Sequence, residues 1–229
     1  MNELPRALAL SFAQLGDPAI LRVLLKSAVL TVTVVVALAV GLSWVVGQVL
    51  ERAGMGGANS TGLAVVLTVL MAAIGLWLLF RIVALAILQL FADDVVAAVE
   101  RKHYHHAATR MQPLPFTRDV TNSLRGMGRA LLANAAALPV AGLLLFTAIG
   151  PAIVFLLVNA VLLGRELQDM VWLRHPEAAT AAAPLSRMAR FALGAVVALM
   201  MAIPFINLLA PIVGAASATH LVHRKTTAQ

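Results

Sequence analysis

The sequence predicts an all-α integral membrane protein with two full transmembrane helices, two re-entrant helical hairpins that are half-inserted, and amphipathic interfacial helices. Of its 229 residues, 61% are hydrophobic and 12% are charged, whereas soluble domains have roughly 45–50% and about 25%. The mean hydropathy is +0.93. Because the surplus apolar residues form long charge-free runs, their solvent is lipid. We expect one membrane domain over residues 1–229.

The first predicted element is an interfacial helix over residues 1–16. Four apolar residues recur at helical spacing and form one stripe along it: Leu4, Leu8, Phe12 and Leu15. Gly16 is suited to end this helix in a left-handed conformation. Asp17 can then cap the next helix, and Pro18 fits that helix's first position.

Two charge-free runs are long enough to be full spans, because about 20 helical residues cross a hydrocarbon core of roughly 30 Å. The first span is expected over 18–50. A glycine-rich connection follows, and the second span is expected over 62–106, where the part after Arg81 becomes an amphipathic cytoplasmic extension. Two cations, Arg22 and Lys26, precede the charge-free part of the first span, residues 27–50, which predicts a cytoplasmic amino terminus.

Two later charge-free runs, 130–164 and 191–223, are too short for two spans each, since two spans and a turn need about 44 residues. Both contain helix breakers: Gly150, Pro151, Pro204 and Pro211. They therefore predict two half-inserted hairpins, the first over 118–165 with a basic amphipathic helix at its start, the second over 186–223. The alternative is that snorkelling arginines stretch either hairpin across the membrane. Each begins and ends beside basic residues, so we expect both termini in the cytoplasm.

The order of these elements and three motifs resemble the CysZ sulfate permease and etoposide-induced membrane protein family over nearly the whole chain. The motifs lie before the first span, after the first hairpin and through the second hairpin: 15–22 (LGDPAILR), 164–170 (GRELQDM), and 203–211 (IPFINLLAP) with 214–219 (GAASAT). The resemblance implies sulfate entry for cysteine biosynthesis, through a homo-dimer or higher homo-oligomer in the bacterial inner membrane. In sulfate-binding members of the family, an arginine pair precedes the first span; here the pair reads Leu21-Arg22.

The first candidate site lies at the start of the first span. Arg22 and Lys26 are one turn apart, and the free N–H groups of the first turn, at Ala19 and Ile20, point to the same end of the helix. A helix N-terminus with two cations is suited to hold a divalent oxyanion such as sulfate. The alternative is that both cations only orient the span and reach lipid headgroups.

Polar residues near the hairpins are the candidates for a pore or gate. They are Asn159, Asn207, Arg165, Glu166 and Asp169, with Glu100 on the cytoplasmic extension. Amides and charges at membrane depth usually face protein or water and mark ion paths. The alternative is structural, because such asparagines also join helices and Arg165 with Asp169 has the spacing of a helical ion pair.

Several functions are not expected. The chain has no Cys, which removes thiolate metal sites and nucleophiles. His103, His105 and His106 lack a third ligand type at fitting spacing, so we predict no metal site and no cofactor. No catalytic motif indicates an enzyme. The formal charge of +7 follows the membrane-flanking cations and does not predict nucleic-acid binding.

The sequence therefore favours uptake of a small oxyanion, sulfate first, by passive or proton-coupled flux at a subunit interface. Lipids, the anion and a second copy of the chain are the expected partners. The competing hypothesis is a membrane scaffold or bilayer-shaping protein of the same fold, which would use asymmetric half-insertion and basic amphipathic helices.

Overall fold

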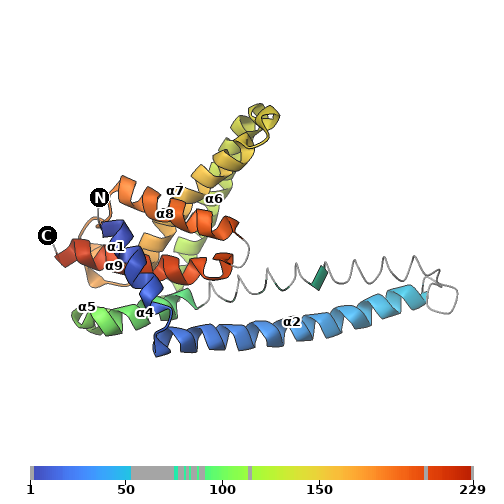
Figure 1. Cartoon of the computed structure of the whole chain (residues 1–229), viewed down its shortest axis with the longest axis horizontal. Coiled ribbons are helices and arrows are strands. Elements are labelled where there is room, and N and C mark those ends of the chain that lie inside the picture. Colours follow the sequence, from blue (N-terminus) through green and yellow to red (C-terminus); the bar gives the residue numbers. More distant parts are fainter. Residues whose placement is uncertain are drawn as a thin grey trace. The chain divides into compact units, whose positions relative to one another are not determined.

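The computed structural model describes residues 3–52, 91–112, 115–203 and 206–227, with positions 75, 76, 80, 83 and 87. Every regular element in these residues is helical (Figure 1), as the sequence predicts. They belong to two compact units, one made of Met1–Leu21 with Ala92–Gln229 and the other of Arg22–Phe91. Most of the predicted second span, 62–80, lies outside the described residues.

The second unit is described chiefly through helix α2, Pro18–Arg52. Its window Pro18–Gly41, with a mean hydropathy of 2.4, is long and apolar enough to cross a membrane. One face is buried and carries two hydroxyls, those of Ser27 and Thr31, which donate to backbone carbonyls of α2 itself. The other faces expose large apolar side chains, among them Val29, Val32, Val36 and Val40. Such a surface is typical of a helix that faces lipid.

In the first unit, α1, Glu3–Gln14, packs against α9, Ala210–Thr227, through an unexpected face. Its buried side chains are Ala7, Ser11 and Gln14. Phe12, from the predicted apolar stripe, is 48% exposed. A small, polar face permits a close, hydrogen-bonded approach to α9. The larger apolar side chains lie nearer the outside, and an interfacial position for this helix stays a prediction.

The connection from α1 to α2 follows the sequence prediction in part. Asp17 caps α2, because the N–H of Ala19 donates to its Oδ1 at 2.9 Å and that of Leu21 to its carbonyl at 2.8 Å. Pro18 is the first residue of α2. The predicted left-handed conformation at Gly16 is wrong. The N–H of Asp17 instead bonds to the carbonyl of Gln14, which closes α1 with a tight turn.

Helix α4, Ala92–His103, is amphipathic as predicted, and α5, His105–Arg110, follows it after Tyr104. The buried face of α4 contains Val95, Val96 and Val99, and also Glu100. Its first turn is joined to the end of the first hairpin by an ion pair between Asp93 and Arg174. This face packs against α9.

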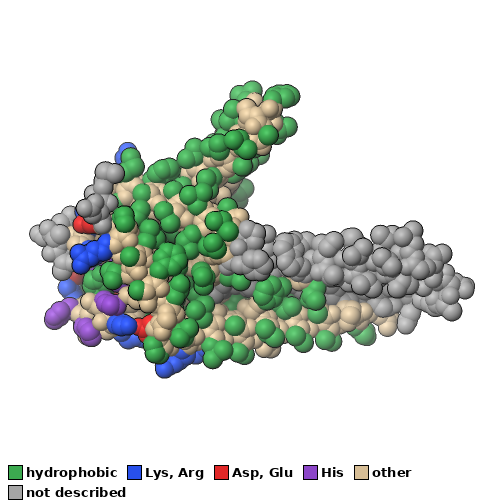
Figure 2. Space-filling model, viewed as in Figure 1, with side chains coloured by type: hydrophobic (Ala, Val, Ile, Leu, Met, Phe, Trp, Pro, Cys, Tyr) green, Lys and Arg blue, Asp and Glu red, His purple; other side chains and the backbone are tan. Residues whose placement is uncertain are grey.

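The first hairpin consists of α6, Phe116–Leu143, a short η1, Leu145–Thr147, and α7, Gly150–Trp172. Its turn lies just before Gly150 and Pro151, which form the first turn of α7. Helix α7 is long and apolar enough to cross a membrane. It continues to Trp172, beyond the predicted end at 165. Arg165 and Asp169 lie one turn apart on a partly exposed face of this continuation and form an ion pair. Hydrophobic side chains follow the outside of this hairpin (Figure 2).

The second hairpin consists of α8, Arg187–Ala202, a short η3, Ile206–Leu208, and α9. Helices α7 and α8 touch through their backbones: a Cβ on Gly164 would lie 1.9 Å from the carbonyl oxygen of Arg190, and one on Gly194 would lie 1.9 Å from that of Ala160. Only glycine permits this approach. Helix α9 is the centre of the unit, since α1, α4, α7 and α8 all pack on it.

Candidate functional site

The buried helix α9 carries polar side chains where a purely structural core helix would be apolar. Every residue from Ala210 to His223 is buried, and these include Ser217, Thr219, His220 and His223. Buried polar groups cost free energy unless hydrogen-bonded. The hydrogen-bond partners of these side chains therefore show which other segments contact α9 through polar groups.

One set of partners comes from α1 and α4. Ser217 donates its hydroxyl to that of Ser11 at 2.9 Å. The side-chain amide nitrogen of Gln14 lies 2.9 Å from Nε2 of His220 and 2.7 Å from Nε2 of His103. An amide has two N–H groups and can donate one to each ring. Partial burial of the ring, followed by the nearby Lys102, lowers the pKa of His103, which favours the neutral ring that can accept such a bond.

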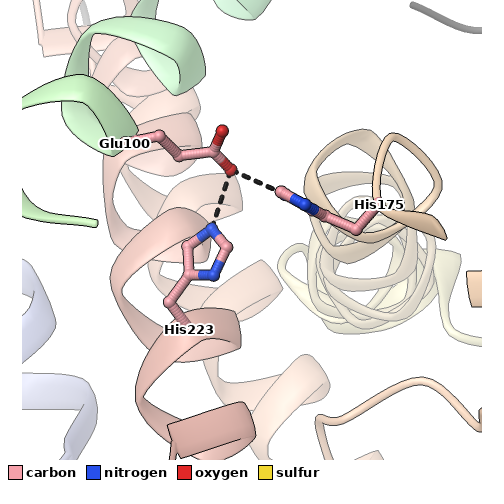
Figure 3. Close-up of side chains that lie close together, drawn as sticks. All are labelled: Glu100, His175 and His223. Carbon is pink, nitrogen blue, oxygen red and sulfur yellow. Dashed lines mark hydrogen bonds and ion pairs between the residues drawn. The ribbon is translucent and has the colours of Figure 1, made fainter. Parts of the chain in front are cut away.

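A second set of partners surrounds Glu100 (Figure 3). Its Oε1 lies 2.9 Å from Nε2 of His175 and 2.7 Å from Nε2 of His223. The side chain of Glu100 is 0% exposed, and those of the two histidines are 5% and 9% exposed. The two imidazoles point at the same carboxylate oxygen. Three segments distant in sequence thus meet in one dry cluster, named here the Glu–His–His cluster.

Local structure explains how each side chain of this cluster is positioned. Glu100 lies in the last turn of α4, on the same buried face as Val96 and Val99. His175 follows the end of α7 in a turn held by its own N–H, which donates to the carbonyl of Trp172 at 3.1 Å. His223 is one helical turn beyond His220 on α9, so both rings lie on the same side of that helix.

The electrostatics of the cluster favour an ionised carboxylate. Burial alone raises the pKa of Glu100, but the hydrogen bonds from His175 and His223 outweigh it and hold the pKa at about 2. The second carboxylate oxygen, Oε2, is buried and has no hydrogen-bond partner within the part of the chain that the structure describes. The cluster therefore combines a fixed negative charge, two imidazole nitrogens and one unused acceptor.

The predicted anion-binding residues lie elsewhere, on α2. Arg22 and Lys26 are both exposed, whereas Ile20 is buried. The N–H of Ala19 is already bonded to Asp17, whose carboxylate also pairs with Lys102. These hydrogen bonds hold the pKa of Asp17 below its ordinary value. The helix start thus has a carboxylate of its own beside it, and the two exposed cations are the groups left to meet an anion.

The predicted gate residues are distributed over several elements. Asn159 and Glu166 are exposed on α7, and Asn207 is buried in η3. Arg165 and Asp169 form an ion pair at 3.6 Å. Glu100 is the one predicted gate residue that belongs to the Glu–His–His cluster.

The sequence did not indicate His175 or His223 as site residues. His175 stands alone after the first hairpin, and His223 ends a charge-free run where basic residues are common at membrane borders. The signal available was the pair His220 and His223, one turn apart at the end of an otherwise apolar helix. Their partners on α4 and after α7 depend on tertiary packing.

The chain matches the family described as sulfate transporter CysZ/etoposide-induced protein 2.4 over residues 7–211. No curated protein and no solved structure matches it. The match covers α1 from Ala7 onward, α2, α4 and both hairpins up to the start of α9. It therefore includes Glu100 and His175 but not His220 or His223. Since it extends over most of the sequence, the chain belongs to the CysZ and etoposide-induced protein 2.4 family.

Proposed function

We propose that this protein is a permease or channel for sulfate or a related small oxyanion in the bacterial inner membrane, with both termini in the cytoplasm. The observation that carries the proposal is membership of a sulfate transporter family over residues 7–211. Two apolar helices of sufficient length, α2 and α7, support a membrane location. On this proposal the anion is used in cysteine biosynthesis, and the chain catalyses no reaction.

The anion would be recognised by Arg22 and Lys26. They lie one turn apart on α2 and are exposed, so they can approach a divalent anion together. Because Asp17 occupies the N–H of Ala19, the backbone of Ala19 and Ile20 contributes less than these charges. Asp17 also lowers the local positive potential, which favours weak, reversible binding over retention of the ion.

The path beyond this site would be lined by the polar residues of the hairpins. Asn159, Glu166 and the Arg165–Asp169 pair lie on exposed or partly exposed faces of α7, where a second copy of the chain can contact them. Few polar side chains line these faces among the described residues of one copy, so a homo-dimer or larger homo-oligomer would supply the remaining wall. Flux would be passive or coupled to protons.

The test is uptake of radiolabelled sulfate by proteoliposomes containing the full chain. Flux above that of empty vesicles is expected, and it should fall at least about tenfold in Arg22→Ala, as for loss of one charge-assisted contact. Arg118→Ala is the matched control, because Arg118 is an exposed cation on α6 that the proposal leaves outside the path. Flux equal to that of empty vesicles contradicts the proposal.

One observation favours the second candidate, a bilayer-shaping or scaffold protein. The start of α6 exposes apolar side chains, Leu124, Met127 and Leu131 among them, along a helix that also carries exposed Arg118 and Arg125. Such a helix can enter the headgroup region of one leaflet. This candidate predicts no sulfate flux and a change in vesicle curvature on addition of the protein, visible by electron microscopy.

A further inference from the structure

The Glu–His–His cluster has the composition of a transition-metal site. Glu100, His175 and His223 each present one ligand atom, and these atoms lie within 4.8 Å of one another. Two imidazoles with one carboxylate form a ligand set that suits zinc, iron, nickel or copper. Magnesium and calcium fit poorly, since both prefer oxygen ligands alone.

The distances permit an ion after a small adjustment. Around a tetrahedral zinc ion, with ligands at 2.0–2.2 Å, neighbouring ligand atoms are about 3.4 Å apart. The two oxygen–nitrogen separations here are 2.9 and 2.7 Å, so they would open by about 0.5 and 0.7 Å. Rotation of the two imidazole rings can provide this movement without a change in the helices.

The unused oxygen of the carboxylate offers a further coordination position. Oε2 of Glu100 is buried, and no hydrogen-bond partner reaches it among the described residues. A fully buried acceptor without a partner costs free energy. If the carboxylate binds an ion through both oxygens, Oε2 is satisfied, and two nitrogens and two oxygens complete a four-coordinate site.

The surrounding helices also favour a cation. Glu100 lies in the last turn of α4, His175 just beyond the end of α7, and His223 close to the end of α9. Each helix carries a partial negative charge, equivalent to about half an elementary charge, at its C-terminus. Each ligand is followed or preceded by an arginine: Arg174 is neutralised by Asp93, Arg101 is exposed to solvent, and Arg224 on α9 opposes the effect.

We propose that Glu100, His175 and His223 bind one divalent transition-metal ion, with zinc as the reference ion. The ion joins α4, the segment after α7 and the end of α9, three parts of the first unit that are otherwise connected through apolar packing and single polar contacts. The site is closed to water, as structural metal sites are. Its role is to fix the cytoplasmic end of the helix core, independent of whether the protein transports sulfate.

The experiment uses the full chain purified in detergent. Metal content is measured by mass spectrometry after EDTA treatment, reloading with zinc and removal of free ions. About one zinc per chain is expected, together with a rise in melting temperature on reloading that magnesium does not produce. In His175→Ala and His223→Ala the retained zinc should fall at least about tenfold, as for loss of a metal ligand.

The matched control is the double variant His105→Ala/His106→Ala, which removes two exposed imidazoles and should retain the zinc. Because the cluster variants alter a buried site and can fail to fold, X-ray absorption of the zinc-loaded natural chain gives a second readout. It should show two imidazoles near 2.0–2.1 Å. No retained zinc, retention in both cluster variants, or loss in the His105/His106 control would overturn the proposal in favour of a metal-free hydrogen-bonded cluster.

Discussion

Helices α2 and α9 reverse the usual relation between polarity and burial. Helix α2 is the more apolar, yet among the side chains that the structure describes it exposes most of the large ones, Val32 and Val36 among them. Helix α9 is buried from Ala210 to His223 and carries serine, threonine and two histidines. In a membrane protein the lipid takes the apolar surface, and the interior is where polar contacts form. The exposed apolar side chains of α2 thus suit contact with lipid, whereas the buried polar side chains of α9 suit contact with other helices of the same chain.

The largest expected loss of stability lies at the contact between α7 and α8, two of the helices that pack on α9. Gly194→Ala places a methyl group against the backbone of Ala160, so the helices must separate. We expect a loss of about 3 kcal/mol, the upper end for overpacking, seen as a lower melting temperature in detergent. Gly128→Ala is the control, since nothing lies within 4 Å of its added Cβ. Equal melting of the two variants would refute the close crossing.

A direct comparison of the two helices uses the same substitution in each. Val213 on α9 is 0% exposed and Val32 on α2 is 57% exposed. Val213→Ala should cost about 2 kcal/mol, because it removes two buried methyl groups and leaves a cavity. Val32→Ala should cost less than about 0.5 kcal/mol. A larger loss of thermal stability in Val32→Ala would mean that the exposure of α2 is misassigned.

The cap of α2 should give a smaller effect with a defined pH dependence. Asp17→Ala removes the side-chain bond to Ala19 and should cost about 1 kcal/mol at pH 7. Since Lys102 and that N–H lower the pKa of Asp17 in the folded state, its stabilisation is present above the unfolded pKa and is lost as the pH falls through the folded one. The melting difference between Asp17→Ala and the natural chain should therefore shrink below pH 3.8.

Asp17→Asn separates capping from charge. Asparagine caps a helix about as well as aspartate, so most of the stability at pH 7 should return. Its melting difference from the natural chain should be smaller than that of Asp17→Ala and should also shrink in acid. If the asparagine variant melts like the alanine variant, the ion pair with Lys102 matters more than the cap.

The sequence predicted much of the fold because its signals are local. Charge-free length located α2, amphipathic spacing located α4, and the caps Asp17 and Pro18 located the start of α2 correctly. The buried face of α1 was not predictable from hydrophobicity, because it consists of Ala7, Ser11 and Gln14. These small or polar residues are buried through a close approach to α9 and through hydrogen bonds to it. How deeply the two hairpins enter the membrane stays a prediction.

The site was less accessible to sequence reasoning. Glu100 was predicted as a gate candidate, but His175 and His223 meet it across sequence separations of 75 and 123 residues. No local spacing encodes such a contact, whereas the HExxH type of metal motif places its ligands on one helix. The oxyanion site on α2 could be predicted because its residues lie within two turns of one helix, between Ala19 and Lys26. Its role in anion binding stays a prediction.

We predict that α2 faces lipid along its exposed side, and a chain without cysteine allows this to be measured with single spin labels in liposomes. Nitroxides at Val29, Val32, Val36 and Val40 should collide readily with lipid-soluble oxygen and little with a water-soluble nickel chelate, while labels at Ser27, Thr31 and Val35 should be shielded from both. High accessibility of the first set to the nickel chelate would contradict a lipid-facing α2.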